Sequence, residues 1–432
     1  MRSLIFHCRP TPMLFATIVV CFMLTINTTA HAYDYPFINA LEATMIGTPK
    51  VYAAKLPKDI NRDERDIEIF KDREVPDIFW YDEELHYTLV KAEGRAPLIF
   101  SIAGTGASHA SEKMLMMERA FYQAGFHVVS LPSPTHPNFI VSSSRSRVPG
   151  LLKEDAVDLY RVMQRIYHEV KSEIEVSEFM LTGYSLGATH SAFVSQLDRS
   201  EKAFGFRKVL MINPPVSLLN STEILDALLV ENAPGGAHDF SAFIERIFAK
   251  VSQIYRQEDF LDLSGDFLYE FYKNEPLEQD DVEKLIGTAF RASSAGMTFV
   301  SDVMTRHGLI VPRNEVLKIS TSTTKFFKIS THLSFRDYID GIVLPYVRKS
   351  RPTMTIDQLD AENSLFAIAS YLDESPQIGL IHNDDDIILK DGEIDYLRQL
   401  FGDRAKIYLT GGHCGNMAHA DNVAHMVQFF KD

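Results

Sequence analysis

The segment of this chain best suited to nucleophilic chemistry is the pentapeptide Gly183-Tyr184-Ser185-Leu186-Gly187. It lies between an apolar run that predicts a buried strand, residues 178–182, and a segment rich in small residues that predicts a helix, residues 187–197. A serine at such a tight turn needs glycines two positions to either side, because the neighbouring chains leave room for nothing larger. The hydroxyl of Ser185 is therefore predicted to stand clear of the sheet and to act as a nucleophile.

Two backbone N–H groups are predicted to hold the negative charge that develops when such a hydroxyl attacks an acyl carbon. Leu186 follows the nucleophile, and the positive end of the predicted helix lies there. The second donor is expected in the loop Ala103-Gly104-Thr105-Gly106, which follows the predicted strand 97–102 and whose glycines permit unusual backbone angles. We assign this donor to the N–H of Thr105, with Gly106 as the alternative.

A serine hydroxyl is a weak nucleophile and needs a base within hydrogen-bond reach. His413 lies in the segment Gly411-Gly412-His413-Cys414-Gly415, directly after the last predicted strand, residues 406–410. The glycines let this loop fold back over the edge of the sheet. Position and flanking glycines select His413 as the general base among the 15 histidines of the chain, with His419 as the alternative.

An acid must hold the imidazole of this base in one tautomer, and three candidates, Asp384, Asp385 and Asp386, follow the predicted strand 377–381. Three adjacent carboxylates are not all buried in ionised form without a large cost, so at most one points into the site. We select Asp386 because it precedes the apolar pair Ile387-Ile388, while Asp384 and Asp385 stay open as alternatives. A calcium loop is disfavoured, because the alternating ligand positions and the central glycine are absent.

The elements around these residues alternate between buried strands and amphipathic helices, which predicts a parallel sheet covered on both faces. The expected strands are residues 97–102, 126–131, 178–182, 209–212, 377–381 and 406–410. The expected helices are residues 111–124, 151–170, 187–197 and 420–430. We therefore expect an α/β core made of residues 97–218 and 371–432.

Two further regions flank or interrupt this core. Residues 33–96 are predicted to form an N-terminal extension and the first antiparallel strands, from the short β-like runs 51–54, 67–70 and 85–90. Residues 219–370 are predicted to be a helical insertion. In this insertion, apolar side chains in residues 240–255 and 267–272 recur at the spacing of one helix face. These faces are expected to pack against the core, and the alternative is that some of their aromatic rings line an acyl or aromatic substrate pocket.

The first 32 residues have the pattern of a secretory signal peptide. Arg2 and Arg9 precede an apolar run, residues 13–24, and small residues follow at positions 28–32. The run is shorter than the ~20 residues that span a bilayer, so a removed signal is favoured over a membrane anchor. The protein is then expected to be periplasmic or secreted.

Composition limits the partners and the cross-links of the chain. The formal net charge is −15, with acidic residues spread along the sequence, so nucleic acid is not an expected partner. Removal of residues 1–32 would take away Cys8 and Cys21 and leave Cys414 as the one cysteine, so no intramolecular disulfide is expected. No metal site or cofactor site is predicted.

With the nucleophile turn, the acid and the histidine in this order, the chain resembles the α/β-hydrolase superfamily. The resemblance covers residues 97–218 and 377–432, and the helical insertion between them resembles the cap or lid of that family. Two positions depart from the family pattern: Ala103-Gly104 stands where the oxyanion loop often has His-Gly, and Asn383 stands where a glycine usually precedes the acid. The resemblance implies an α/β-hydrolase fold, hydrolysis through an acyl-enzyme, and no metal or organic cofactor.

Our functional hypothesis is an exported carboxylesterase or lipase-like enzyme that cleaves esters or thioesters of a small acyl substrate. Transient contact of the cap with a membrane or lipid is compatible with this hypothesis. One alternative is a serine peptidase of the same fold that acts on short peptides, with Glu223, Asp226 or Glu231 holding the amino terminus of the substrate. A second alternative is a binding protein that keeps the fold without turnover.

Overall fold

The computed structural model describes residues 33–230 and 278–432. The chain divides into two compact units, residues 1–34 and 35–432, and the description below concerns the second. The predicted signal peptide, the two apolar faces at 240–255 and 267–272, and Glu231 lie outside the described residues, so those predictions stay untested. Among the helices in the described ranges, none combines the length and the apolar character that crossing a membrane requires.

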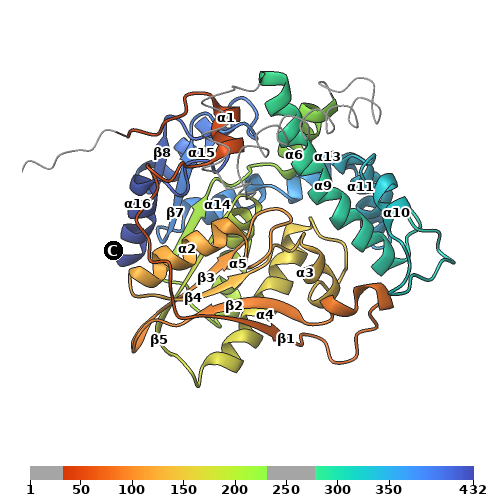
Figure 1. Cartoon of the computed structure of the whole chain (residues 1–432), viewed down its shortest axis with the longest axis horizontal. Coiled ribbons are helices and arrows are strands. Elements are labelled where there is room, and N and C mark those ends of the chain that lie inside the picture. Colours follow the sequence, from red (N-terminus) through yellow and green to blue (C-terminus); the bar gives the residue numbers. More distant parts are fainter. Residues whose placement is uncertain (1–32, 231–277) are drawn as a thin grey trace, which may run out of the picture. The chain divides into compact units, whose positions relative to one another are not determined.

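In the described residues, eight strands form one mixed sheet in the order β1-β2-β4-β3-β5-β6-β7-β8 (Figure 1). Their bounds are β1 Arg62–Ile67, β2 Leu85–Val90, β3 Arg95–Ile102, β4 His127–Leu131, β5 Glu175–Tyr184, β6 Lys208–Ile212, β7 Ile378–Asn383 and β8 Ala405–Tyr408. The strands β1 and β2 pair antiparallel, β2 also pairs antiparallel with β4, and every pair from β4 to β8 is parallel. The predicted mostly parallel sheet is confirmed.

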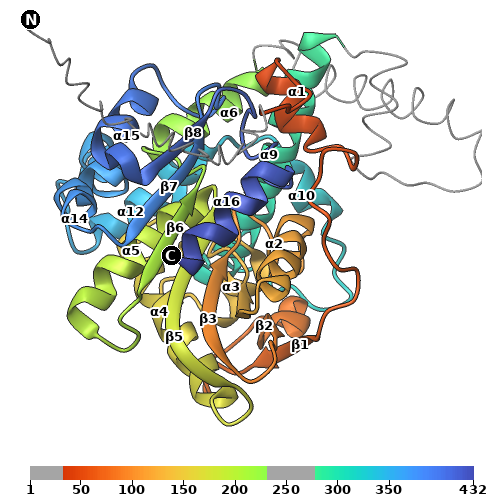
Figure 2. The same ribbon diagram turned by 90° about the vertical axis from the view of Figure 1, so that its left-hand side faces the viewer.

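Helices cover both faces of this sheet, as the alternation of strands and helices predicted. Helices α2 (Glu112–Gln123) and α16 (Ala420–Lys431) lie on one face, and α4 (Leu152–Val170) and α5 (Leu186–Glu201) lie on the other (Figure 2). On the first face, the rings of Phe121 and Phe430 join α2 to α16, with centroids 5.4 Å apart.

The main core fills the second face, because alternate side chains of each central strand point toward α4 and α5. From β3 these are Leu98, Phe100 and Ile102, all fully buried, and they pack in one cluster with Leu159 and Val162 of α4. The side chains between them point to the opposite face and are equally buried, which explains why the strands read as continuous apolar runs.

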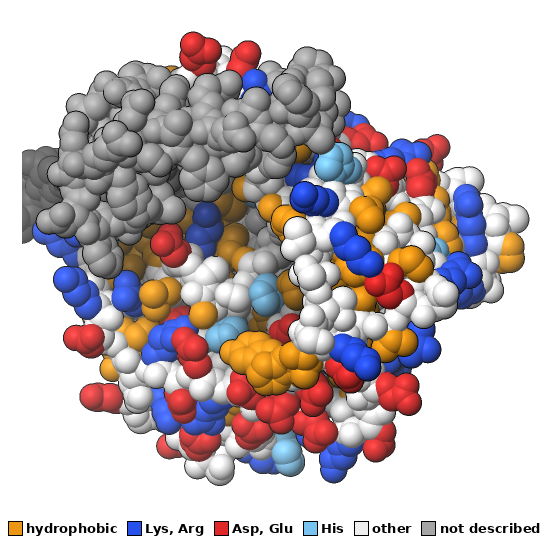
Figure 3. All heavy atoms as spheres, turned by 45° about the vertical axis from the view of Figure 1, so that its right-hand side comes forward, with side chains coloured by type: hydrophobic (Ala, Val, Ile, Leu, Met, Phe, Trp, Pro, Cys, Tyr) orange, Lys and Arg blue, Asp and Glu red, His pale blue; other side chains and the backbone are white. Residues whose placement is uncertain are grey.

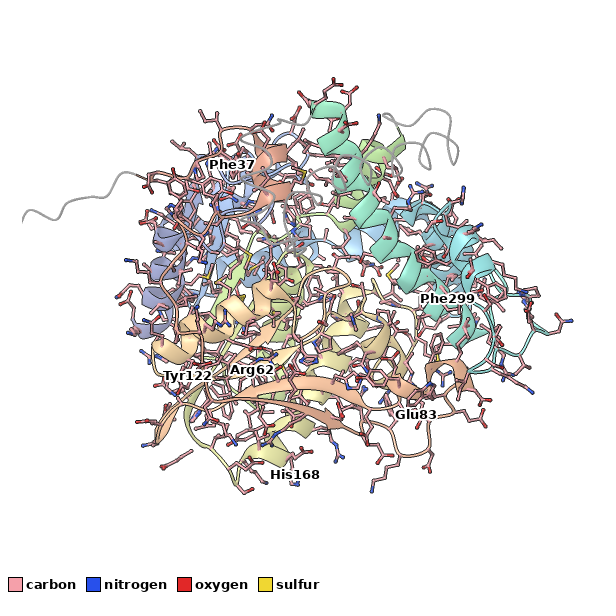
Figure 4. All side chains as sticks on the ribbon, in the orientation of Figure 1. Phe37, Arg62, Glu83, Tyr122, His168 and Phe299 are labelled. Atoms are coloured by element: carbon pink, nitrogen blue, oxygen red, sulfur yellow. The ribbon has the colours of Figure 1, made fainter. Side chains whose placement is uncertain are left out.

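Two of the three short β-like runs near the N-terminus were predicted wrongly. Residues 51–54 form no strand, and Ala53 makes only an isolated bridge with His419. The first strand is β1, which ends where the run 67–70 was expected to begin. Its sequence is Arg-Asp-Glu-Arg-Asp-Ile, and such polar residues suit an edge strand with little burial. Arg62, which lies between this strand and α2 in Figure 4, pairs with the buried Glu118 at 2.7 Å.

The part of residues 219–370 that the structure describes is helical, as expected, and lies between β6 and β7 in the chain. Its helices are α6 (Leu218–Val230), α9 (Gln279–Thr305), α10 (Thr324–Ser330), α11 (Phe335–Tyr338), α12 (Leu344–Arg348) and α13 (Ile356–Glu362), followed by α14 (Ala369–Asp373). Apolar residues of α9 form a second core with the short helix α3 (Pro137–Ser142), which the sequence did not predict. On α9, Phe299 also meets Phe79, close to Glu83 in Figure 4, at a ring distance of 6.1 Å.

The C-terminal end of α9 is held by the buried carboxylate of Asp302. Its Oδ1 accepts the backbone N–H groups of Gly308 and Leu309, and its Oδ2 accepts those of Ile310 and Val311, at 2.8–2.9 Å. One side chain thus satisfies four backbone donors in the loop that leaves the helix, and this loop is buried at Ile310 and Val311.

Asp302→Asn is expected to destabilise the protein by about 3 kcal/mol, because the amide keeps one acceptor and turns an NH2 group toward two buried N–H groups. Urea unfolding would measure the loss as a lower midpoint. The matched control is Asp340→Asn, an exposed acid paired with Arg336, which is expected to cost less than about 0.5 kcal/mol. Equal midpoints for the two variants would contradict the role assigned to Asp302.

Candidate active site

Ser185 lies at the turn between β5 and α5, in a backbone conformation that side chains rarely adopt. Its φ and ψ are 53° and −129°. The flanking glycines are required by contact distances: a Cβ on Gly183 would lie 2.3 Å from the carbonyl oxygen of Gly187, and a Cβ on Gly187 would lie 2.2 Å from that of Ile102. The predicted strand-turn-helix geometry of the pentapeptide is therefore present, with Ser185 as N-cap of α5.

The structure brings His413 to Ser185 from 228 residues away in the sequence. The imidazole Nε2 lies 2.9 Å from the Ser185 Oγ, and the Nδ1 lies 3.1 Å from each carboxylate oxygen of Asp386. The loop that carries His413 turns through Gly411 and Gly412, which have φ angles of 154° and 53°. A base, a hydroxyl and an orienting carboxylate are thus in hydrogen-bond contact in one line.

The three candidate acids take three different positions. Asp386 is buried, and its carboxylate also accepts the side-chain amide of Asn213 at 3.0 Å and the N–H of Ile388 at 3.2 Å. Asp385 accepts the N–H groups of Gly411 and Gly412, so it braces the loop that carries the base. Asp384 is exposed and pairs with Arg398. Of the three, Asp386 is the one in contact with the imidazole.

These positions place the nucleophile turn after a central parallel strand, the acid after β7 and the histidine after β8, in a sheet that begins with antiparallel β1 and β2. The chain has the α/β-hydrolase fold. The sequence-based prediction of fold class is confirmed. In this α/β-hydrolase fold the three side chains share one edge of the sheet, because parallel strands end their carboxyl ends together.

No protein-family model and no curated protein matches the chain. Among solved structures, a putative hydrolase from Legionella pneumophila is 12% identical with a TM-score of 0.44, covering 90% of this chain and 92% of its own. A fungal esterase from Rhizomucor miehei is 14% identical with a TM-score of 0.42, covering 88% and 85%. A proline iminopeptidase from Mycobacterium smegmatis is 12% identical with a TM-score of 0.39, covering 85% and 98%.

The loop predicted to supply the second oxyanion donor packs directly on the nucleophile. A Cβ on Gly104 would lie 3.1 Å from the Cβ of Ser185 and 2.7 Å from the ring of Tyr184, so only glycine permits this approach. The N–H of Gly106 donates to the hydroxyl of Thr135 at 2.8 Å, which removes Gly106 as the alternative donor.

The two N–H groups that we assigned, those of Thr105 and Leu186, have no acceptor among the residues that the structure describes. Thr105 lies in a turn closed by the N–H of Ala107 and the carbonyl of Gly104, with Gly106 at a φ of 66°. Leu186 is the first residue of α5, where a backbone N–H has no partner within the helix. Both groups are therefore available to a substrate oxygen.

Electrostatics couples the acid and the base. Burial disfavours the charged form of His413, but the carboxylate of Asp386 and the sulfur of Cys414 outweigh burial and raise the pKa of His413 well above its ordinary value. Burial likewise acts to raise the pKa of Asp386, and the neighbouring imidazoles of His413 and His382 outweigh it, so the net pKa is lowered. Asp386 thus stays ionised and strengthens the base.

His419, the alternative base, takes a structural position instead. It is buried, it is the N-cap residue of α16, and its Nδ1 accepts the N–H of Asp421 at 3.3 Å. The hydrogen bond from His413 to Ser185 leaves no place for His419 in the same role.

Several residues that hold the site were missed by the sequence analysis. Thr44, in the unpredicted helix α1 (Ala40–Ile46), accepts the backbone N–H of His413 with its hydroxyl at 2.8 Å. Asn383, at the end of β7, donates to the carbonyl of Gly412 at 2.7 Å. Asn213 follows β6 directly, and a polar residue at the carboxyl end of a parallel strand was the available signal. Thr44 had no local signal.

Proposed function

We propose that this protein is an exported serine hydrolase that cleaves carboxylic ester or thioester bonds through an acyl-enzyme. The observation that carries the proposal is the contact of the Ser185 hydroxyl with the His413 imidazole at 2.9 Å, backed by Asp386 at 3.1 Å. A hydroxyl becomes a strong nucleophile when its proton passes to a neighbouring base as it attacks.

In the proposed mechanism, the Oγ of Ser185 forms a bond to the acyl carbon while its proton passes to Nε2 of His413. The N–H groups of Leu186 and Thr105 stabilise the oxyanion of the tetrahedral intermediate. The intermediate collapses as His413 returns the proton to the leaving alcohol or thiol. Water then attacks the acyl-enzyme with the same base, which releases the acid and restores Ser185.

The peptidase alternative loses support in the part of the chain that the structure describes. Asp226 is paired with Arg291 at 2.6 Å, and its second oxygen accepts the N–H of Phe335, so this carboxylate is already engaged. Glu223 lies near two cations of the chain itself, Arg336 and Lys390. We therefore place esters and thioesters ahead of peptides as substrates.

Export rests on the sequence of residues 1–32, and we propose a periplasmic or secreted location on that ground. The helical region between β6 and β7 is proposed to act as a cap that admits a small acyl substrate, with transient contact to a membrane or lipid. No cofactor takes part in the proposed reaction.

A substrate panel tests the proposed function. We expect p-nitrophenyl esters from acetyl to dodecanoyl, or the matching acyl thioesters, to be hydrolysed with an initial burst of product as the acyl-enzyme accumulates. Aminoacyl p-nitroanilides run in parallel separate a peptidase from an esterase. Hydrolysis of the anilides alone would replace the esterase proposal by the peptidase, and binding without turnover of any substrate would favour the silent binding protein.

A further inference from the structure

A pocket with an unusual excess of positive charge lies outside the proposed active site. It has a volume of about 420 Å³ and is formed by the loop after β1 and the loop after α3. Its charged lining residues are Lys71, Arg73, Arg145 and Arg147, against the one acid Asp72. Four cations around one cavity repel each other unless an anion lies among them.

The guanidinium groups of this pocket lack acceptors that arginine side chains normally find. The Nε atoms of Arg73 and Arg147 are buried and donate to no acceptor in the described ranges. Within those ranges, neither arginine forms an ion pair with a carboxylate, and the Nη2 of Arg73 reaches only the backbone carbonyls of Ile140 and Ser144. A buried donor without a partner costs about 1–3 kcal/mol, so two of them in one pocket call for a ligand.

The nearest acid is already engaged. Asp158 accepts the backbone N–H of Arg145 with one oxygen and pairs with Arg161 through the other, both at 2.7 Å. Burial and the charges of Arg147 and Arg161 lower the pKa of Arg73 to about 10. Like charges therefore press on Arg73 without a free carboxylate to balance them.

Other arginines of this acidic chain show the contrast. Arg62, Arg65 and Arg207 each meet the carboxylate of a glutamate at 2.6–2.7 Å. Basic and acidic side chains are also interspersed over the face shown in Figure 3. With a net charge of −15, carboxylates are abundant, so a pocket of four cations with one acid is not a result of composition.

The loop that carries two of the arginines is fixed in shape. Arg147 has a φ of 61°, a conformation that side chains avoid. It is held there because the Oγ of Ser144 accepts its N–H at 3.0 Å, and the hydroxyl of Ser301 on α9 donates to its carbonyl at 2.7 Å. The guanidinium of Arg147 thus starts from a backbone that is already in place, which lowers the entropy lost on binding.

We propose that Lys71, Arg73, Arg145 and Arg147 form a binding site for a phosphate group. Guanidinium forks match the oxygen pairs of phosphate, and a dianion balances several cations better than one carboxylate does. The phosphate is either a free ion or small phosphate ester, or the headgroup of an anionic lipid. The site is independent of the proposed hydrolase chemistry, since it shares no residue with it.

Calorimetry on the full chain with inorganic phosphate tests this site, with chloride at the same ionic strength as the reference. We expect saturable binding of phosphate, weakened at least about tenfold by the double variant Lys71→Gln with Arg145→Gln. These two side chains make no printed contact that holds the fold, so the variant is expected to fold, as circular dichroism would check. The control Arg95→Gln removes an exposed cation 3.7 Å from Glu175 and is expected to bind as the wild type does.

Vesicles distinguish the two sources of the phosphate. Binding to phosphatidic acid in phosphatidylcholine, lost in the double variant, supports the lipid headgroup, whereas binding of free phosphate without binding to vesicles supports the small ligand. The proposal is overturned if the double variant binds phosphate as tightly as the wild type, or if chloride gives the same heat. Ester hydrolysis, measured alongside, reports separately on the proposed active site.

Discussion

Ser185→Ala is expected to lower ester hydrolysis by about 10⁴–10⁶-fold and to abolish labelling by a fluorophosphonate probe. The hydroxyl is the one group lost, and it is the group that the imidazole of His413 contacts at 2.9 Å. Hydrolysis rates give the size of the loss, and the mass of the intact protein after labelling shows whether an adduct has formed.

The matched control is Ser191→Ala, on the same helix α5. The hydroxyl of Ser191 is buried and donates to the carbonyl of Gly187 at 2.9 Å, so its removal tests the loss of a buried hydroxyl near the site without loss of the nucleophile. We expect this control to keep the adduct and most of the activity. An adduct of equal yield in Ser185→Ala would assign the nucleophile to another residue.

Asp386→Asn is expected to lower kcat by about 10³–10⁴-fold. An amide in this position turns an N–H donor toward Nδ1 of His413, which favours the tautomer with the proton on Nε2 and so blocks the acceptor that Ser185 needs. Steady-state kinetics on the best ester of the panel measures the loss. A fall in kcat with little change in KM is expected, because the carboxylate acts on the base and does not touch the substrate.

The same variant is expected to shift the pH dependence of the residual activity to lower pH. The neutral imidazole is the active form of the base, and the carboxylate of Asp386 raises the pKa of His413, so the wild type needs a higher pH to free the base. Without the carboxylate, burial is left to lower this pKa, and the rising limb of kcat/KM moves down in pH. A rising limb that stays in place would show that Asp386 does not act on His413.

Asp384→Asn is the control for both effects. This acid is two residues away in the sequence, but it is exposed and paired with Arg398. We expect activity within about twofold of the wild type and an unchanged pH profile, because an exposed pair is weak and screened. A large loss in this control, with Asp386→Asn active, would reverse our choice among the three acids.

Strands of the core were predictable because burial on both faces leaves a run of apolar residues. Strand β2 was predicted at its observed bounds, 85–90, and β6 within one residue. The edge strand β1 was missed because its charged residues carry no apolar pattern, and the short helices α1 and α3 were missed because one or two turns give too little periodicity. Predictability thus followed how much apolar surface each element buries.

The sequence by itself determined the nucleophile turn and the order of serine, acid and histidine, because local sterics act within a few residues: only glycine fits at positions 183 and 187. The tertiary structure decided which of three adjacent aspartates meets the imidazole. Pairing of β7 with β8 fixes where the strand ends, with the N–H of Asp384 bonded to the carbonyl of Tyr408, and one step along the chain turns a carboxylate from the interior to the solvent. Thr44 and the cationic pocket came likewise from contacts between distant segments, which no local pattern encodes.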